Sequence, residues 1–184
     1  MLVFNFSPFP NLETNRLNLR RLTSEDVDEI LVLRSNPEIM QFIPRPLIKS
    51  KEEALEFITT MNAAVDSNTV INWAITTKEN DELIGMIGFY RIKPENYRAE
   101  VGYILSAAYH GQGIITEALQ RVIQFGFEEM GLNSIEAVID PENFGSEKVL
   151  LKNNFVKEGH FKEHTFFEGK FLDSVFYSLL KKNY

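Results

Sequence analysis

The spacing of hydrophobic residues along the chain switches several times between a period of two and a period near 3.6. Residues 16–22 alternate in strand fashion, and residues 27–34 and 54–61 then carry apolar side chains at helical spacing. Alternation is typical of a half-buried strand, whereas the longer period is typical of an amphipathic helix. The first third of the chain therefore predicts one strand followed by two helices, joined by a loop around 44–46 that two prolines mark.

The middle of the chain has a different character. Residues 70–77, 82–92 and 98–106 have the pattern of three strands separated by short polar turns, which predicts an antiparallel meander. Residues 114–130 return to helical spacing. Gly131 ends that helix because glycine tolerates the left-handed conformation found at many helix C-termini.

The last third predicts one more strand, a short helix and a hairpin. The strand covers residues 134–139 and the helix 143–152, and the hairpin pairs 155–166 with 171–180. Asn154 stands just after the helix, where a left-handed residue is needed and asparagine is tolerated.

This order of elements defines the fold class as a mixed α/β sheet of about seven strands with four or more helices. Its only strand–helix–strand crossover lies between residues 98 and 139, so one central parallel pair should sit inside a mostly antiparallel sheet. We find no internal repeat and no linker. We therefore expect a single domain over residues 1–184, with 1–12 as an N-terminal extension.

Composition narrows the class of protein. Hydrophobic residues make up 44 % of the 184 residues and charged residues 24 %, both ordinary for a globular protein in water. The chain has no cysteine, which excludes disulfides, thiolate metal sites and a cysteine nucleophile. The first residues lack the pattern of a signal peptide, and no apolar run approaches the roughly 18 residues of a membrane span. We expect a cytoplasmic protein that binds no membrane.

The charge balance points away from nucleic acid. The formal net charge is −7 at pH 7, which would repel a phosphate backbone and favours a cationic partner such as an amine. An acidic surface that serves only solubility is the alternative. His160 and His164 fall on one face of a predicted strand, but no third ligand accompanies them at metal spacing, so we expect no metal site.

The most informative stretch joins the last strand of the meander to the long helix. Gly111 and Gly113 stand between them, where the absence of Cβ atoms lets the backbone approach a ligand. Amides of such a loop converge with the unpaired amides of the helix N-terminus, and the helix dipole favours an anion such as a pyrophosphate. A tight strand-to-helix turn is the alternative. Ile114 and Ile115 exclude a P-loop, and Thr116 stands where a dinucleotide fingerprint requires a third glycine.

Five stretches of the chain, taken in order, resemble the GNAT acetyltransferases, and in particular the branch that acetylates ribosomal-protein N-termini. They are residues 13–20 (ETNRLNLR), 99–103 (AEVGY), 110–118 (HGQGIITEA), 143–146 (NFGS) and 151–155 (LKNNF). Together they extend over nearly the whole chain, and their order and spacing are specific although no single stretch is. Ala108 departs from the family pattern, which has Arg or Gln there, and Asn154 replaces the usual glycine.

The resemblance implies a GNAT fold and acetyl-CoA as the co-substrate. It implies that the backbone of Tyr103, Ile104 and Leu105 pairs with the pantetheine arm as an added strand would. It also implies that amides of the glycine loop hold the pyrophosphate. The cofactor-binding residues expected in the loop and beyond it are His110, Gly111, Gln112, Gly113, Ile114, Ile115, Thr116 and Asn143.

Glu100 is the candidate general base, because it lies in the strand that leads to the glycine loop. It would take a proton from the attacking amine through a water molecule. A solvated strand carboxylate, or one paired with Arg98 or Arg91, is the alternative.

Ser146 matches the family position proposed for the group that protonates the leaving thiolate. The alternative is structural, with Asn143 capping a helix and Ser146 in its first turn. Tyr103 and Tyr109 are further candidate acids, and the resemblance places a substrate loop at residues 42–46.

These residues and the resemblance together predict an N-acetyltransferase that moves acetyl directly to a primary amine, with a protein N-terminal α-amine as the expected acceptor. An α-amine has a pKa of about 8 and a lysine side chain one of about 10.4, so the α-amine needs less help from a base. Two alternatives stay open: an acetyltransferase for small amines such as polyamines or antibiotics, and a CoA-binding module without catalysis. A monomer and a homodimer are both compatible with the sequence.

Overall fold

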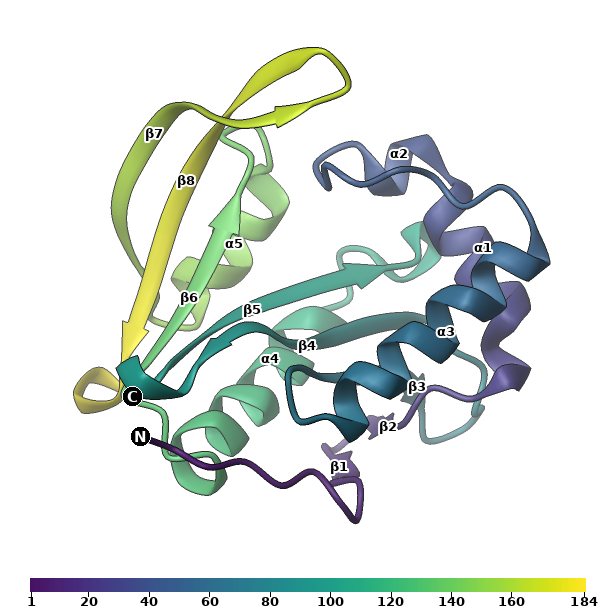
Figure 1. Cartoon of the computed structure of the whole chain (residues 1–184), viewed down its shortest axis with the longest axis horizontal. Coiled ribbons are helices and arrows are strands. Elements are labelled where there is room, and N and C mark those ends of the chain that lie inside the picture. The colour runs from purple at the N-terminus through teal and green to yellow at the C-terminus, as the bar shows by residue number, and fades with distance from the viewer.

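Eight strands form a single mixed sheet in the computed structural model, which describes residues 1–184 (Figure 1). They are β1 (Leu12–Glu13), β2 (Leu17–Arg20), β3 (Ile71–Thr77), β4 (Gly85–Lys93), β5 (Arg98–Leu105), β6 (Ser134–Ile139), β7 (Val156–Phe167) and β8 (Lys170–Leu180). Their order across the sheet is β1-β2-β3-β4-β5-β6-β8-β7. Only β5 and β6 are parallel, and every other neighbouring pair is antiparallel.

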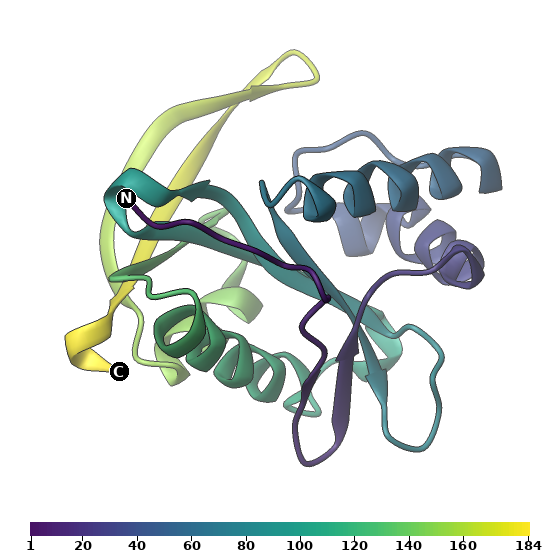
Figure 2. The same ribbon diagram turned by 60° about the horizontal axis from the view of Figure 1, so that its bottom comes forward.

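Five α-helices cover the two faces of this sheet. They are α1 (Val27–Ser35), α2 (Pro37–Met40), α3 (Lys51–Asp66), α4 (Ile114–Gln124) and α5 (Phe144–Lys152). Figure 2 shows α1 and α3 on one side of the central strands and α4 on the other. A π-helical turn, Phe125–Glu129, continues α4. None of these helices combines the length and the apolar composition that crossing a bilayer requires.

Each face of the sheet has its own hydrophobic core. On the α4 face, β3 and β5 contribute Trp73 and Val101 to a large cluster that includes Leu119 of α4. On the other face, Ile104 of β5 packs with Ile30 of α1 in a smaller cluster. Because successive residues of a strand point to opposite faces, alternate residues of β5 enter different cores.

The predicted order of elements and the single parallel pair are confirmed, and the differences are local. The sheet has eight strands instead of about seven, because the short strand β1 pairs with β2. The helix α2 was not predicted, although its start carries a recognisable signal. The side-chain oxygen of Asn36 accepts hydrogen bonds from the amides of Glu38 and Ile39, and Pro37 occupies the first helical position.

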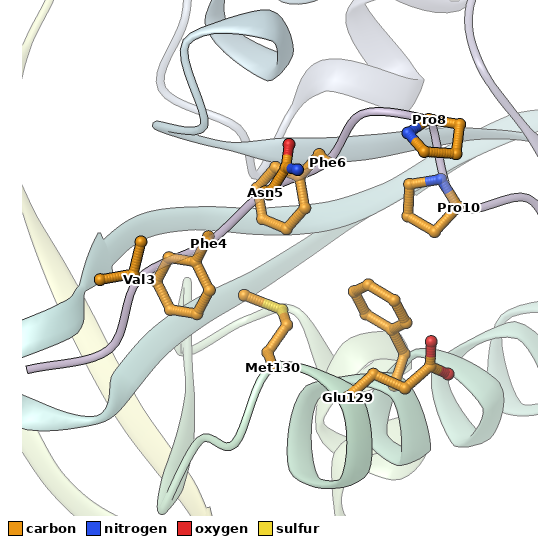
Figure 3. Close-up of a pocket in the computed structure, with 9 residues that line it drawn as sticks. Val3, Phe4, Asn5, Phe6, Pro8, Pro10, Glu129 and Met130 are labelled. Carbon is orange, nitrogen blue, oxygen red and sulfur yellow. The ribbon is translucent and has the colours of Figure 1, made fainter.

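The N-terminal segment before β1 lies along the α4 face of the sheet. The amide of Phe6 donates to Asn68 Oδ1 at 2.7 Å, and the indole N–H of Trp73 donates to Pro10 O at 2.7 Å. Figure 3 shows a pocket between this segment and the end of α4, with Phe4 and Met130 among its lining residues. Trp73 is therefore a core residue beneath the N-terminal segment.

Candidate active site

The parallel strands β5 and β6 pair over only part of their length. Their register covers Arg98 to Glu100, whereas β5 continues to Leu105 and stays paired with β4 throughout. β6 pairs instead with β8 along its whole length. From Val101 to Leu105 one edge of β5 therefore has no strand partner, and Figure 1 shows the two strands diverging. Tyr103, Ile104 and Leu105 all lie on this unpartnered stretch.

The unpartnered edge leads directly into the glycine loop. Gly111 and Gly113 have positive φ angles of 74° and 76°, which glycine adopts without the steric cost that a Cβ adds. None of the backbone amides from Gly111 to Thr116 donates a hydrogen bond within the protein, and regular bonding begins with Glu117 N to Gly113 O at 3.1 Å. A run of free amides at the N-terminus of α4 is suited to an anion.

Side chains at the start of this loop are used to hold its shape. The ring nitrogen Nε2 of His110 lies 3.1 Å from Leu105 O, and the amide of His110 donates to Ala107 O at 3.1 Å. Gln112 Nε2 donates to Ala108 O at 2.9 Å. The amide of His110 is therefore already occupied, and the free amides begin one residue later than the expected set.

A hairpin far away in sequence fixes the other side of the loop. Glu117, in the first turn of α4, accepts a hydrogen bond from Thr14 Oγ1 at 2.6 Å and pairs with Arg16 Nε at 2.6 Å. Arg16 Nη1 also donates to Gln112 O at 3.1 Å. Burial acts to raise the pKa of Glu117, but the bonds from Thr14 and Arg16 outweigh it and lower that pKa. This clamp joins the β1–β2 hairpin to the free amides.

Glu100 faces the side of the sheet that α1 and α3 cover. It shares this face with Ile104, four residues further along β5, because every second residue of a strand points to the same face. Its carboxylate is mostly covered, with 19 % of the side chain exposed, and pairs with Arg91, which is 61 % exposed. Arg98 pairs with Glu136 at 2.6 Å instead. Of the two partners considered from the sequence, Arg91 is the one present.

Ser146 lies on the opposite side of β5. Asn143 caps α5, and its side-chain oxygen accepts the amide of Ser146 at 3.0 Å. The hydroxyl of Tyr103 reaches the same turn, 3.5 Å from Ser146 O, and burial raises the pKa of Tyr103 to about 12. The structural role of Asn143 is thus present, while the hydroxyl of Ser146 itself has no partner in the protein.

The strand β5 therefore separates two sets of candidate groups. Glu100 is on one face, and Tyr103 with Ser146 is on the other. A reaction at the edge of the strand would have a carboxylate on one side and hydroxyl groups on the other. A mixed sheet that opens beside a loop of free amides is the architecture of the GNAT acetyltransferases.

Comparison with known proteins agrees with this class. A family model described as an acetyltransferase (GNAT) domain matches residues 16–156. An uncharacterized N-acetyltransferase of Bacillus subtilis, YoaA, is 35 % identical over 173 residues, which cover 94 % of this chain and 98 % of that protein. The ribosomal-protein-serine acetyltransferase of Escherichia coli is 31 % identical over 148 residues, 80 % and 82 % of the two chains.

One solved structure has the same fold at lower identity. It is a ribosomal alpha-N-protein acetyltransferase in complex with coenzyme A, with a TM-score of 0.85, 22 % identity, and coverage of 95 % of this chain and 100 % of that one. The chain described here belongs to the GNAT family and is an acetyltransferase.

The sequence alone did not point to the clamp on the glycine loop. Arg16 and Glu117 are 101 positions apart, and no local pattern connects them. Arg34 falls in the helical spacing that starts with Val27 and Ile30, but the sequence assigns it no role. A charged residue at such a position is the signal that would have found it.

Proposed function

We propose that this enzyme transfers acetyl from acetyl-CoA directly to the α-amine of a protein N-terminus. The observation that carries the proposal is the unpartnered edge of β5, which runs into the free amides from Gly111 to Thr116. One element supplies a row of strand-type donors and acceptors, and the next supplies a concentrated set of donors for an anion.

Coenzyme A fits this pair of features. Its pantetheine arm carries two amides that need partners, and the edge of β5 from Val101 to Leu105 offers them. Its pyrophosphate needs several donors and little side-chain bulk. A Cβ added at Gly111 would meet nothing within 4 Å, so space lies open beside the free amides. Acetyl-CoA would supply the acetyl group in activated form, as a thioester.

Glu100 is proposed to accept the proton that the amine must lose before it attacks. The carboxylate lies on the face of β5 covered by α1 and α3, and its partner Arg91 is largely in solvent. A surface ion pair of this kind is weak, because water screens it and long side chains lose entropy in it. The carboxylate can therefore exchange Arg91 for an ammonium group or a bridging water.

Ser146, on the opposite face of β5 from Glu100, is proposed to donate a hydrogen bond to the leaving thiolate of CoA. Its backbone amide is held by Asn143, and this contact fixes the first turn of α5 while its hydroxyl keeps a free donor. Tyr103 lies beside it with a pKa of about 12, raised by burial, so the phenol keeps its proton at neutral pH. At this position Tyr103 serves as a hydrogen-bond donor, whereas a group with a pKa nearer neutrality transfers protons more readily.

Proton cost favours an α-amine as the acceptor. At neutral pH the neutral form of a lysine side chain is roughly 250 times scarcer than that of an α-amine, as their pKa values of about 10.4 and about 8 require. A single carboxylate is a weak base for deprotonating the ammonium group of a lysine side chain. The E. coli relative is named for the serine of a ribosomal protein, which supports a protein acceptor here.

The proposal is tested by release of free thiol from acetyl-CoA with matched peptides. We expect turnover with a peptide that has a free N-terminus and no lysine, and much slower turnover with an N-terminally blocked peptide that contains lysine. Mass spectrometry of the product locates the acetyl group. Equal or faster modification of the blocked peptide would refute the α-amine preference while leaving the family assignment intact.

A further inference from the structure

Six arginines of this chain are paired with carboxylates, and two are not. The paired ones are Arg16, Arg20, Arg21, Arg91, Arg98 and Arg121. The other two are Arg34, in the last turn of α1, and Arg45, in the loop after α2. The amide of Ile48 donates to Arg34 O at 3.0 Å, so the loop that carries Arg45 runs beside the end of α1, and the charge of Arg45 lowers the pKa of Arg34. Acidic residues outnumber basic ones in this chain, which makes two arginines without a counterion unusual.

The surroundings of Arg34 leave most of its donors unused. Its guanidinium carbon lies 4.5 Å from the centre of the Phe57 ring, in a cation–π contact with α3. Its Nε is buried and has no hydrogen-bond partner. Burial lowers the pKa of Arg34, Tyr90 acts to raise it, and Arg45 lowers it further, with no contribution from a carboxylate. Arg34 as a whole is partly exposed, but its buried Nε without a hydrogen-bond partner costs free energy, so a purely structural role is a poor explanation for it.

Arg34 borders the face of the sheet that carries the candidate base. Tyr90 of β4 is the direct cross-strand neighbour of Glu100, and both point to the face covered by α1 and α3. The hydroxyl of Tyr90 bonds to Asn72 Oδ1, which holds the ring in place. Residues of α1 pack on this face together with Met86 and Ile104, and the charge of Arg34 acts on Tyr90, so the guanidinium lies on the same side of the sheet as the Glu100 carboxylate.

We propose that Arg34 binds a carboxylate on the acceptor, and that the acceptor therefore carries a negative charge a short distance from the amine presented to Glu100. A guanidinium binds a carboxylate through two parallel hydrogen bonds, which fills its unused donors and neutralises its charge. This inference rests on the proposed function, which makes the acceptor a polypeptide with a free N-terminus. For a protein N-terminus, the carboxylate is an aspartate or glutamate side chain near the N-terminus, and the second and third residues are the positions to vary.

The inference is tested with peptides that share a free N-terminus and differ only at the second and third residues, which are glutamate, glutamine or arginine. We expect kcat/KM of the parent enzyme to be about ten to a hundred times higher for glutamate than for glutamine, the range of a charge-assisted hydrogen bond, and lowest for arginine. In Arg34→Gln the glutamate-to-glutamine ratio should fall to within about threefold. Arg34→Lys should give an intermediate ratio, because lysine keeps the charge but not the paired donors.

Arg21→Gln is the matched control. Arg21 also lies over an aromatic ring, 5.9 Å from the centre of Phe9, but it is paired with Asp66 at 2.8 Å. This variant should keep the parent's preference for acidic peptides. Melting temperature separates the two roles further: Arg34→Gln should melt close to the parent, because loss of the cation–π contact with Phe57 is offset by removal of a cation without a counterion.

Two readouts keep this inference separate from the proposed function. Calorimetric binding of the same peptides to the enzyme with CoA gives the glutamate-to-glutamine ratio without turnover. If free amino acids replace peptides as acceptors, the proposed function fails, and the ratio is then measured with glutamate against its amide. A parent enzyme that prefers glutamine or arginine, or an Arg34→Gln variant that keeps the acidic preference, overturns the role of Arg34.

Discussion

Replacing Gly111 by alanine separates the ligand function of the glycine loop from its contribution to stability. The residue has a φ of 74°, and a Cβ built there would meet no atom within 4 Å. The substitution therefore creates no clash, and its cost is the backbone strain of a left-handed alanine, about 1–2 kcal/mol. For a chain of this size that corresponds to a fall in melting temperature of about 2–8 °C.

Gly169 provides a control with the same local geometry. It lies in the turn between β7 and β8 with a φ of 81°, and a Cβ there would also meet nothing within 4 Å. Gly169→Ala should therefore lower the melting temperature as much as Gly111→Ala does. The two variants differ only in what their backbone amides are expected to bind.

Calorimetric titration with CoA distinguishes the two glycines. The Cβ of Gly111→Ala enters the open space beside the free amides, where the pyrophosphate is expected to lie, so at least one charge-assisted bond to the pyrophosphate should be lost. Such a bond contributes about 1.5–3 kcal/mol, which is a loss of about ten- to a hundredfold in affinity. Gly169→Ala should bind CoA within about twofold of the parent. Parent-like affinity in Gly111→Ala, at the same fall in melting temperature as the control, would refute the assignment of the loop.

Two further predictions concern carboxylates. Glu100→Gln should lower the acetylation rate most at low pH, with partial recovery as pH rises and the amine loses its proton unaided. A pH–rate profile that matches the parent's would leave Glu100 as the partner of Arg91 only. The pKa of Glu117 is lowered in the folded protein, so its stabilising contribution is present above the unfolded pKa of about 4.3 and is lost as pH falls through the folded value. Glu117→Gln should therefore lose less stability than the parent between about pH 5 and 3 in scanning calorimetry, and identical acid limbs would contradict the clamp with Arg16.

Local patterns predicted the elements well because the signals lie within each element. Asn154 does adopt a left-handed φ of 62°, and the side-chain oxygen of Asn143 does cap the helix that follows it. The helix predicted for residues 114–130 changes to a π-helical turn after Gln124. Residue spacing does not distinguish a π-helical turn from the last turns of an α-helix.

Contacts between distant segments were out of reach of the same reasoning. The clamp of Arg16 on Glu117 joins the first hairpin to α4 across 101 positions. The end of pairing between β5 and β6 after Glu100 depends on how two strands curve, which neither strand determines alone. The glycine loop could be found from sequence because its requirement is local, whereas the unpartnered strand edge beside it could not.

Strand alternation, by contrast, predicts from the sequence alone on which face of β5 each candidate group lies. Glu100 and Tyr103 are three positions apart in one strand, so an odd number of steps places them on opposite faces. The groups assigned to the amine and to the leaving thiol are thereby kept apart by the backbone of β5 itself. The backbone edge of β5 and the amides of the loop carry the proposed binding of acetyl-CoA. Because these are backbone groups, many different side chains at these positions are compatible with that binding. Choice of acceptor then falls to side chains on the other face, where Arg34 has no carboxylate partner and a buried Nε that donates to no group of the protein.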